Sequence, residues 1–329
     1  MGKKNFFSLI GLTSIVLILP PLIGNPYYIG ILVFVGIYSL ITIGLSLLMG
    51  YTGQISLGHA AFFGVGAYTS GILSTRFGLD PWLALLASLL LAAGIAFIIG
   101  APALRLKGHY LAMATLAFGE IIYIVFNQWI EYTGGPSGFG EIPRFCIGGF
   151  SLESDFSYYY FVWVIVILIL VMALNLIHSR IGRALRSIHG SEIAARAMGV
   201  NVSRYKLQVF ILSAVFASLA GSLYAHFVTF ISPTSFSVMF SVALVTMVAV
   251  GGMTNVWGAM VGAALLTVLP EYLRVFEDYD ILIYGATLLL IMIFLPEGVV
   301  GGIFQLFKER MTRRSVKFTL NVKSLWRRY

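Results

Sequence analysis

The chain has 329 residues, of which 59% are hydrophobic and 10% are charged, and its formal net charge is +8 at pH 7. Soluble domains carry roughly 25% charged residues, so this composition excludes an ordinary soluble protein and indicates an integral membrane protein. The basic residues lie at the ends of apolar runs and form no groove-binding face, which argues against a nucleic-acid partner. Cys146 is the only cysteine, which excludes an intramolecular disulfide and a cysteine-based metal cluster.

Apolar runs long enough to cross a bilayer follow one another along the chain. The first begins at Phe6 and lacks an A-x-A-like cleavage site, so we expect it to remain as an uncleaved span. The expected spans are 6–24, 27–50, 58–75, 82–100, 110–130, 157–177, 206–227, 238–251, 254–270 and 281–300. The sequence therefore predicts an all-α polytopic membrane protein with about ten transmembrane helices, some of them short or broken.

Charge placement predicts the orientation of these spans. Lys3 and Lys4 put the N-terminus in the cytoplasm by the positive-inside rule. Ten passes then place 105–109, the loop 178–206 and the C-terminal tail on the same side. Every lysine and arginine lies on that side except Arg76, Arg144 and Arg274. The predicted topology is N-in and C-in, with 131–156 as a large external loop.

Two glycine-rich tracts interrupt the apolar runs, one within 50–71 and one at 251–255. Irregular backbone at membrane depth persists only where protein covers it or water solvates it. Paired interruptions point to a transport path, and tight helix packing without substrate contact is the alternative. The candidate path residues are Gly50, Gly53, Gln54, Ser56, Gly58, His59, Glu120, Gly251, Gly252, Thr254 and Asn255.

Glu120 is the one acid expected near mid-membrane, in the run 110–130. A charge there costs about 2.5–3.5 kcal/mol or more unless it is paired or hydrated. We expect Glu120 to make a buried structural hydrogen bond, to a hydroxyl or to a histidine such as His59, with a role in substrate passage as the alternative. His59 alone fits a hydrogen-bonded core residue better than a ligand.

The external loop contains the glycine-rich stretch 133–140, which resembles a phosphate loop only superficially. No Lys-Ser/Thr pair follows it, and no G-x-x-x-x-G-K-[ST] motif occurs in the chain. We therefore expect no cofactor in this chain. If ATP drives the protein, another subunit binds it.

The segment 179–206 is the only internal stretch that fits a water-exposed helical unit. Its basic residues are accompanied by a single acid, Glu192, and its pattern predicts two short amphipathic helices separated by Gly190 at a C′ position and Ser191 as an N-cap. The second helix is expected to end at Gly199. Such a pair on a membrane protein indicates a docking surface, with a merely solvated basic loop as the alternative. The candidate docking residues are Arg180, Arg183, Arg186, Glu192, Ile193, Ala194, Ala195, Ala197, Met198 and Gly199.

Four ordered motifs resemble the LivM-type permease of bacterial branched-chain amino-acid ABC importers. They are GYTGQISLGHAAFFGVGAYTSG (50–71), LKGHYLAMATLAFGE (106–120), TGGPSGFG (133–140) and SRIGRALRSIHGSEIAARAMGVN (179–201). The resemblance runs from about Ile37 to Glu297. It implies a type II ABC importer-like permease, without catalysis of its own, in the bacterial inner membrane. The implied partners are a sister LivH-type permease, two cytoplasmic ATPase subunits and a periplasmic binding protein that delivers leucine, isoleucine or valine.

The same resemblance assigns 179–201 as the segment that couples the permease to its ATPases, although the match is loose at Ile193. The permease domain is expected over 1–307. The basic tail 308–329 follows it in the cytoplasm, either as a topology determinant or resting on anionic lipid.

Other functions stay open from the sequence. A permease for urea or short amides is the close alternative. A secondary transporter or channel would normally use several ionisable groups in the membrane, whereas this chain offers Glu120 and His59. A membrane enzyme would need a cluster of His, Asp or Glu at one depth, and the sequence displays none.

Overall fold

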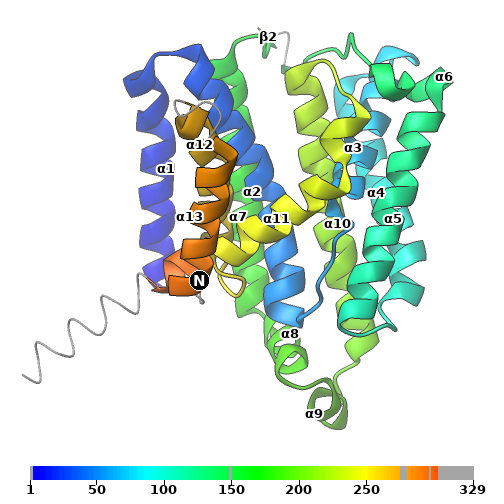
Figure 1. Ribbon diagram of the computed structural model, residues 1–329, viewed down its shortest axis with the longest axis vertical. Helices are drawn as coiled ribbons and strands as arrows, with labels where there is room; N and C mark the ends of the chain where they lie inside the picture. Colours follow the sequence, from blue (N-terminus) through cyan, green and yellow to red (C-terminus); the bar gives the residue numbers. More distant parts are fainter. Residues whose placement is uncertain (1–2, 148–149, 275–279, 296–297, 303–329) are drawn as a thin grey trace, which may run out of the picture.

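The computed structural model describes residues 3–147, 150–274, 280–295 and 298–302, and each expected span is a helix there (Figure 1). Within the described residues, seven helices have the length and hydropathy to cross a membrane: α1 Lys3–Ile23 (from Asn5), α2 Pro26–Thr52, α4 Pro81–Ala103, α5 His109–Gln128, α7 Asp155–His178, α10 Val202–Val228 and α12 Val256–Leu273. Three are shorter: α3 His59–Thr75, α11 Val238–Gly251 and α13 Asp280–Phe294. The prediction of an all-helical membrane bundle with short elements is confirmed.

Local sequence signals set where several helices start and stop. Asn25 caps α2 by accepting a hydrogen bond from the backbone N–H of Tyr27, and a proline follows the cap. Asp80 caps α4 in the same way, again with a proline in the first turn. Gly53 ends α2 in the left-handed conformation, with φ of 68°.

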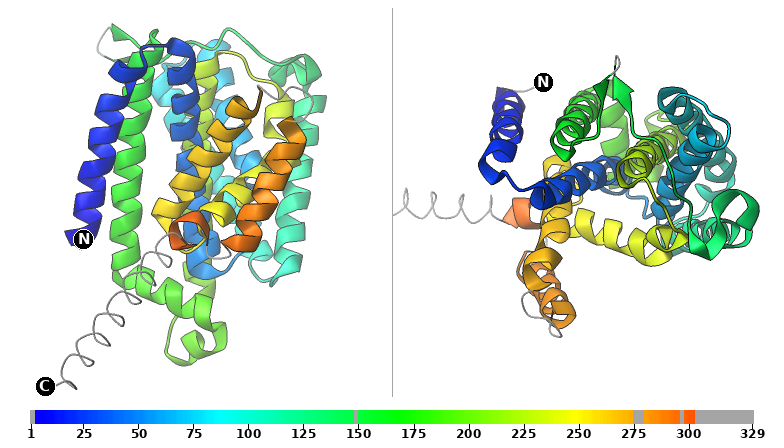
Figure 2. Two further views of the ribbon diagram at one scale, coloured as in Figure 1. Left: turned by 60° about the vertical axis from the view of Figure 1, so that its left-hand side comes forward. Right: turned by 90° about the horizontal axis from the view of Figure 1, so that it is seen from above.

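The core of the bundle lies around α2 and α10. In the most apolar stretch of α2, 78% of the residues are buried, and in that of α10, 61% are buried. In that of α1, only 17% are buried. Helix α10 packs on α3, α2 and α4, while α2 also packs on α7 and α12. Helix α1 lies at the edge against α7 (Figure 2). The peripheral helices therefore expose apolar surface suited to lipid or to another subunit.

Helices α3 and α11 each follow a non-helical segment. Segment 53–58 leads from the end of α2 to the start of α3. The strap 229–237, which contains η2 Pro233–Phe236, leads from α10 to α11. Helix α11 then crosses obliquely between α13 and α5 on one face of the bundle (Figures 1 and 2).

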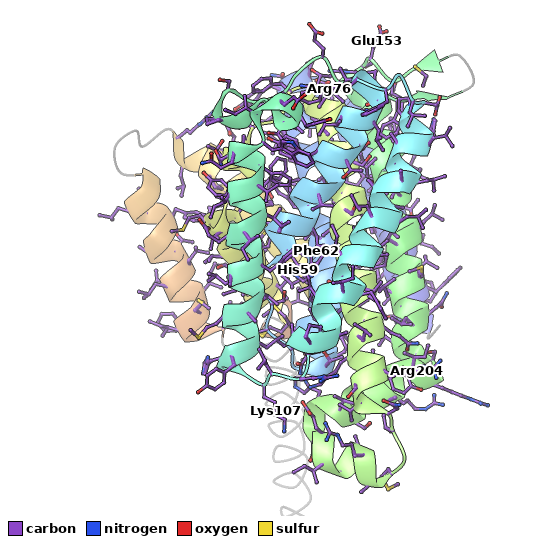
Figure 3. All side chains as sticks on the ribbon, turned by 90° about the vertical axis from the view of Figure 1, so that its right-hand side faces the viewer. His59, Phe62, Arg76, Lys107, Glu153 and Arg204 are labelled. Carbon is purple, nitrogen blue, oxygen red and sulfur yellow. The ribbon has the colours of Figure 1, made fainter. Side chains whose placement is uncertain are left out.

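The charge pattern separates as the topology predicts. Lys107 and Arg204 lie at one end of the bundle, and Arg76 and Glu153 lie at the other (Figure 3). The end with Arg204 carries α8 Arg180–Gly190 and α9 Glu192–Ala197, together with the start of α1 (Figure 1). This is the predicted cytoplasmic side. The predicted tail 308–329 lies outside the described residues.

The opposite end carries the predicted external loop. It contains α6 Ile130–Thr133, η1 Gly135–Ser137 and two antiparallel strands of two residues each, β1 Cys146–Ile147 and β2 Phe150–Ser151. Phe139 exchanges two backbone hydrogen bonds with Ile231, so this loop is tied to the strap that follows α10.

Candidate functional site: coupling hairpin and translocation path

Helices α8 and α9 form a hairpin, called the coupling hairpin below, which projects beyond the membrane helices (Figure 3). Ser179 caps α8 through the N–H groups of Ile181 and Gly182, and Ser191 caps α9 through the N–H of Ala194. The predicted N-cap at Ser191 is confirmed. The prediction that Gly190 stands at a C′ position is wrong, because α8 includes Gly190 and ends with Ser191 as its C-cap.

The end of α9 is a complete Schellman motif. Gly199 has φ of 82°, and its N–H donates to the carbonyl of Arg196. The N–H of Val200 donates to the carbonyl of Ala195. The predicted helix stop at Gly199 is therefore confirmed, and the left-handed backbone explains why a glycine stands there.

The hairpin has a small core of its own and an exposed apolar tip. Ala195 packs in that core with Ile188 and Val202, whereas Ile193 is 80% exposed and Met198 is 84% exposed. The remaining candidate docking residues are exposed or half-buried: Arg180, Arg183, Arg186, Glu192, Ala194, Ala197 and Gly199. Replacing Ala195 would thus perturb the hairpin itself and not a docking surface.

The base of the hairpin rests on the end of α2. Leu185 of α8 is fully buried and belongs to the main core of the bundle. A Cβ atom on Gly53 would lie 3.3 Å from the Nδ1 atom of His189. The guanidinium of Arg186 donates to the carbonyl of Ile177 at 3.2 Å, which ties α8 to the end of α7. Movement of the hairpin would therefore press directly on α2.

The last turns of α2 lead into the first glycine-rich tract, within 50–71, and also contact the second, at 251–255. The Ser46 hydroxyl donates to the carbonyl of Met253 at 3.0 Å. A Cβ atom on Gly50 would lie only 1.8 Å from that same carbonyl oxygen, so only glycine fits there. The structure thus brings the two predicted interruptions together at the cytoplasmic end of α2.

The second tract is held by close helix contact. A Cβ atom on Gly251 would lie 2.0 Å from the carbonyl oxygen of Gly258, and one on Gly262 would lie 1.9 Å from that of Met247. These glycines let α11 and α12 approach closely, as small-xxx-small motifs do in membranes.

Side chains from other helices satisfy the backbone of the first tract. The N–H of Leu57 donates to the Thr115 hydroxyl of α5 at 3.0 Å, and the N–H of Ala60 donates to the Ser241 hydroxyl of α11 at 3.1 Å. Buried irregular backbone requires such partners. Sequence reasoning missed both hydroxyls, because nothing local links them to a segment so distant in the chain.

His59 is a core residue in this conformation. Its Nδ1 lies 3.1 Å from the Ser56 hydroxyl, its Nε2 lies 2.7 Å from the Ser213 hydroxyl, and the residue is 1% exposed. Gln54 and Gly58 are buried too, and the Oε1 atom of Gln54 has no partner among the described residues. These residues line no open surface here.

Part of the second tract borders an open cleft. Thr254 and Asn255 line a cleft of about 610 Å³ between the end of α11 and α13, together with Met253 and Leu295. Gly251 and Gly252 are buried beside it. The polar side chains that line this cleft therefore come from the turn between α11 and α12.

Glu120 departs from expectation. It is exposed on the outward face of α5, so the predicted buried hydrogen bond is wrong, and His59 is paired with serines. Thr115 and Phe118 carry the buried face of α5, while Met113, Ile121 and Ile124 share the outward face with the acid. The sequence shows the helical spacing but not which face of α5 meets the bundle.

A family model described as branched-chain amino acid transport system / permease component matches residues 27–292. The LivM high-affinity branched-chain amino acid permease of Escherichia coli K12 is 34% identical over 287 residues, covering 80% of this chain and 68% of the relative. The chain belongs to this permease family. The predicted resemblance is confirmed.

More distant relatives include one that is named for the same cargo and one that is named for a sugar. A probable LivM permease of Methanocaldococcus jannaschii is 21% identical, covering 82% of this chain and 92% of the relative. The ribose import permease RbsC of E. coli K12 is 26% identical, covering 88% and 92%. No solved structure matches the chain. The permease is thus a multi-span membrane transport protein of a group whose members differ in substrate.

Proposed function

We propose that the permease is one transmembrane subunit of an ATP-driven importer of leucine, isoleucine and valine in the bacterial inner membrane. A LivH-type sister permease would complete the pore, two ATPase subunits would bind at the cytoplasmic side, and a periplasmic binding protein would deliver substrate. The identity with LivM over 80% of the chain supports this substrate class. The chain itself would perform no chemistry.

The observation that carries this proposal is the exposed tip of the coupling hairpin. Ile193 and Met198 expose large apolar side chains on α9 and directly after it. Helix α9 lies beyond the membrane helices, on the predicted cytoplasmic side (Figure 1). Exposed apolar residues rimmed by polar ones mark an interaction site. Arg180, Arg183 and Arg186 are exposed on α8 of the same hairpin and would orient a partner electrostatically.

The contacts suggest how ATP-driven movement reaches the membrane. Closure of the ATPases would displace the hairpin, in which α8 packs on α2 and His189 lies beside Gly53. The final turns of α2 contact Met253, and the chain continues from them into the segment 53–58. A shift there would change both tracts together and open the pore to one side or the other, as two-state importers require.

The translocation path itself we assign to the outward face of α5 and the cleft beside Thr254 and Asn255. Glu120 on that face supports this assignment, because an acid facing hydrocarbon costs about 2.5–3.5 kcal/mol unless it is hydrated or paired. Helix α11 lies between these two surfaces (Figures 1 and 2). The sister permease would face this side and enclose the path.

The test is uptake by proteoliposomes containing both permeases and both ATPases, supplied with the binding protein. We expect ATP-dependent uptake of labelled leucine, with competition by isoleucine and valine. Urea and ribose serve as the comparison substrates, and inactive ATPases serve as the matched control. Uptake of urea would replace the substrate assignment. Leucine uptake driven by a proton gradient without ATP would indicate a secondary transporter.

A further inference from the structure

Lys206 is a buried base near the start of α10. Its side chain is only 3% exposed, whereas Arg204 in the same turn is exposed. Lysine is almost never fully buried unless it is paired. Its ammonium group donates to the Oε1 atom of Glu192, the first residue of α9. A buried base near the membrane surface thus meets the only acid of the coupling hairpin.

Both carboxylate oxygens of Glu192 are engaged within the chain. Lys206 holds Oε1, and Arg196 lies 3.7 Å from Oε2 one turn along α9. The side chain of Glu192 is 22% exposed and that of Arg196 is 59% exposed. The carboxylate therefore faces α10, while the apolar tip at Ile193 and Met198 faces solvent.

The pair joins two elements that differ greatly in how firmly they are held. Helix α9 has six residues, too few to be stable alone. The core it shares with the rest of the chain has three buried side chains, Ile188, Ala195 and Val202. Helix α10, in contrast, packs on three helices of the main bundle. Besides the packing of Ala195 on Val202, the charge pair links the side chains of α9 and α10, and it reaches a full turn further along α10.

We propose that Glu192 and Lys206 form a brace that makes α9 move together with α10. Glu192 is then a positioning residue inside the permease and not a contact to the ATPase. The inference rests on the proposed function, in which α9 receives the ATPase movement. Breaking a buried ion pair leaves an uncompensated charge, so without the brace α9 would move while α10 stayed in place.

The test compares Glu192→Gln and Lys206→Met with the charge reversal E192K/K206E in the complete importer. Arg196→Gln is the matched control, because it removes the exposed partner of the same carboxylate. We expect each single variant to retain its ATPase subunits and to lower uptake per ATP hydrolysed about tenfold. We expect the reversal to recover most of that ratio and Arg196→Gln to leave it unchanged.

Hydrogen exchange provides a second measurement that needs no transport. In the purified permease, Glu192→Gln should speed exchange of the amides of 194–200 while the amides of α10 beyond its first turns stay protected. Unchanged exchange together with unchanged uptake per ATP would overturn the brace. Loss of the ATPases from the Glu192→Gln complex without recovery by the reversal would also overturn it, because Glu192 would then contact the ATPase directly.

Failure of the brace and failure of the proposed function are distinguishable. If the brace is wrong, the wild-type complex still shows ATP-dependent uptake and only the variants fail to behave as expected. If the proposed function is wrong, the wild-type complex itself shows no ATP-dependent uptake.

Discussion

At the residue scale, Glu120 places a strong constraint on how the permease is assembled. Its carboxylate lies on an α5 face that otherwise carries Met113, Ile121 and Ile124. Charged residues inside membranes almost always face a bundle interior or a water-filled cavity. We therefore propose that the outward face of α5 is a protein or water interface in the working importer, where the acid would bind the ammonium group of a passing amino acid.

We predict that Glu120→Gln lowers uptake of leucine by about threefold to tenfold, since removal of one favourable charge interaction costs on the order of 1 kcal/mol. The melting temperature of the complex should stay the same or rise, because a charged group leaves the membrane. Glu131→Gln, which removes an acid from the external end, should leave uptake unchanged. Wild-type uptake in the Glu120→Gln complex would remove Glu120 from the path.

The local sequence pattern predicted those features that depend on residues close together in the chain. The exposed positions of Ile193 and Met198 and the turn at Gly199 follow from short-range spacing. The core position of His59 was predicted and is confirmed, but its partner Ser213 and the burial of Lys206 were not predictable in the same way. The partners of Lys206 and His59 lie 14 and 154 residues away, and a lysine in sequence normally indicates a solvated position.

At the scale of elements, the hairpin of α11 and α12 depends on backbone contact. A Cβ atom on Gly258 would lie 2.4 Å from the carbonyl oxygen of Gly251, and neither helix can move away without losing its other neighbours. The turn between the two helices carries Met253, which α2 contacts. Loosening this hairpin would therefore also loosen the cytoplasmic end of α2.

We predict that Gly258→Ala destabilises the permease by about 1–3 kcal/mol, the usual cost of overpacking. Gly94→Ala is the matched control, since Gly94 is also within a helix but a Cβ atom there meets no neighbour. That variant should be neutral or stabilising by about 0.5–1 kcal/mol. Thermal unfolding of the purified permease measures both. Equal melting temperatures for the two variants would contradict close packing at Gly258.

Hydropathy was sufficient to find the described helices of the membrane bundle, because each apolar run must hide its backbone from lipid. It could not show that α11 runs obliquely or that hydroxyls of α5 and α11 pair with the backbone N–H groups of Leu57 and Ala60. Those features depend on contacts between segments far apart in the chain. The face of α5 that meets the bundle was hidden for the same reason, and the expectation for Glu120 failed with it.

At the scale of the whole molecule, the structure connects one surface to the interior by continuous contact. Helix α8 of the coupling hairpin packs on α2, with His189 beside Gly53, and α2 contacts Met253 and leads into 53–58. The brace proposed at Glu192 and Lys206 would add α10 to the elements that the hairpin moves. An importer driven from the cytoplasm needs such a connection, because ATP is hydrolysed outside the membrane.

The most direct test of this account replaces the apolar tip of the coupling hairpin with charge, in the double variant I193D/M198D. Interface anchors of this kind contribute about 2 kcal/mol or more each, so we expect the ATPase subunits to be lost from the purified complex and ATP-dependent uptake to disappear. Phe77→Asp is the control, since Phe77 is 64% exposed and adjoins Arg76 at the opposite end. If I193D/M198D keeps its ATPases and its uptake while Phe77→Asp behaves identically, the hairpin is not the coupling surface.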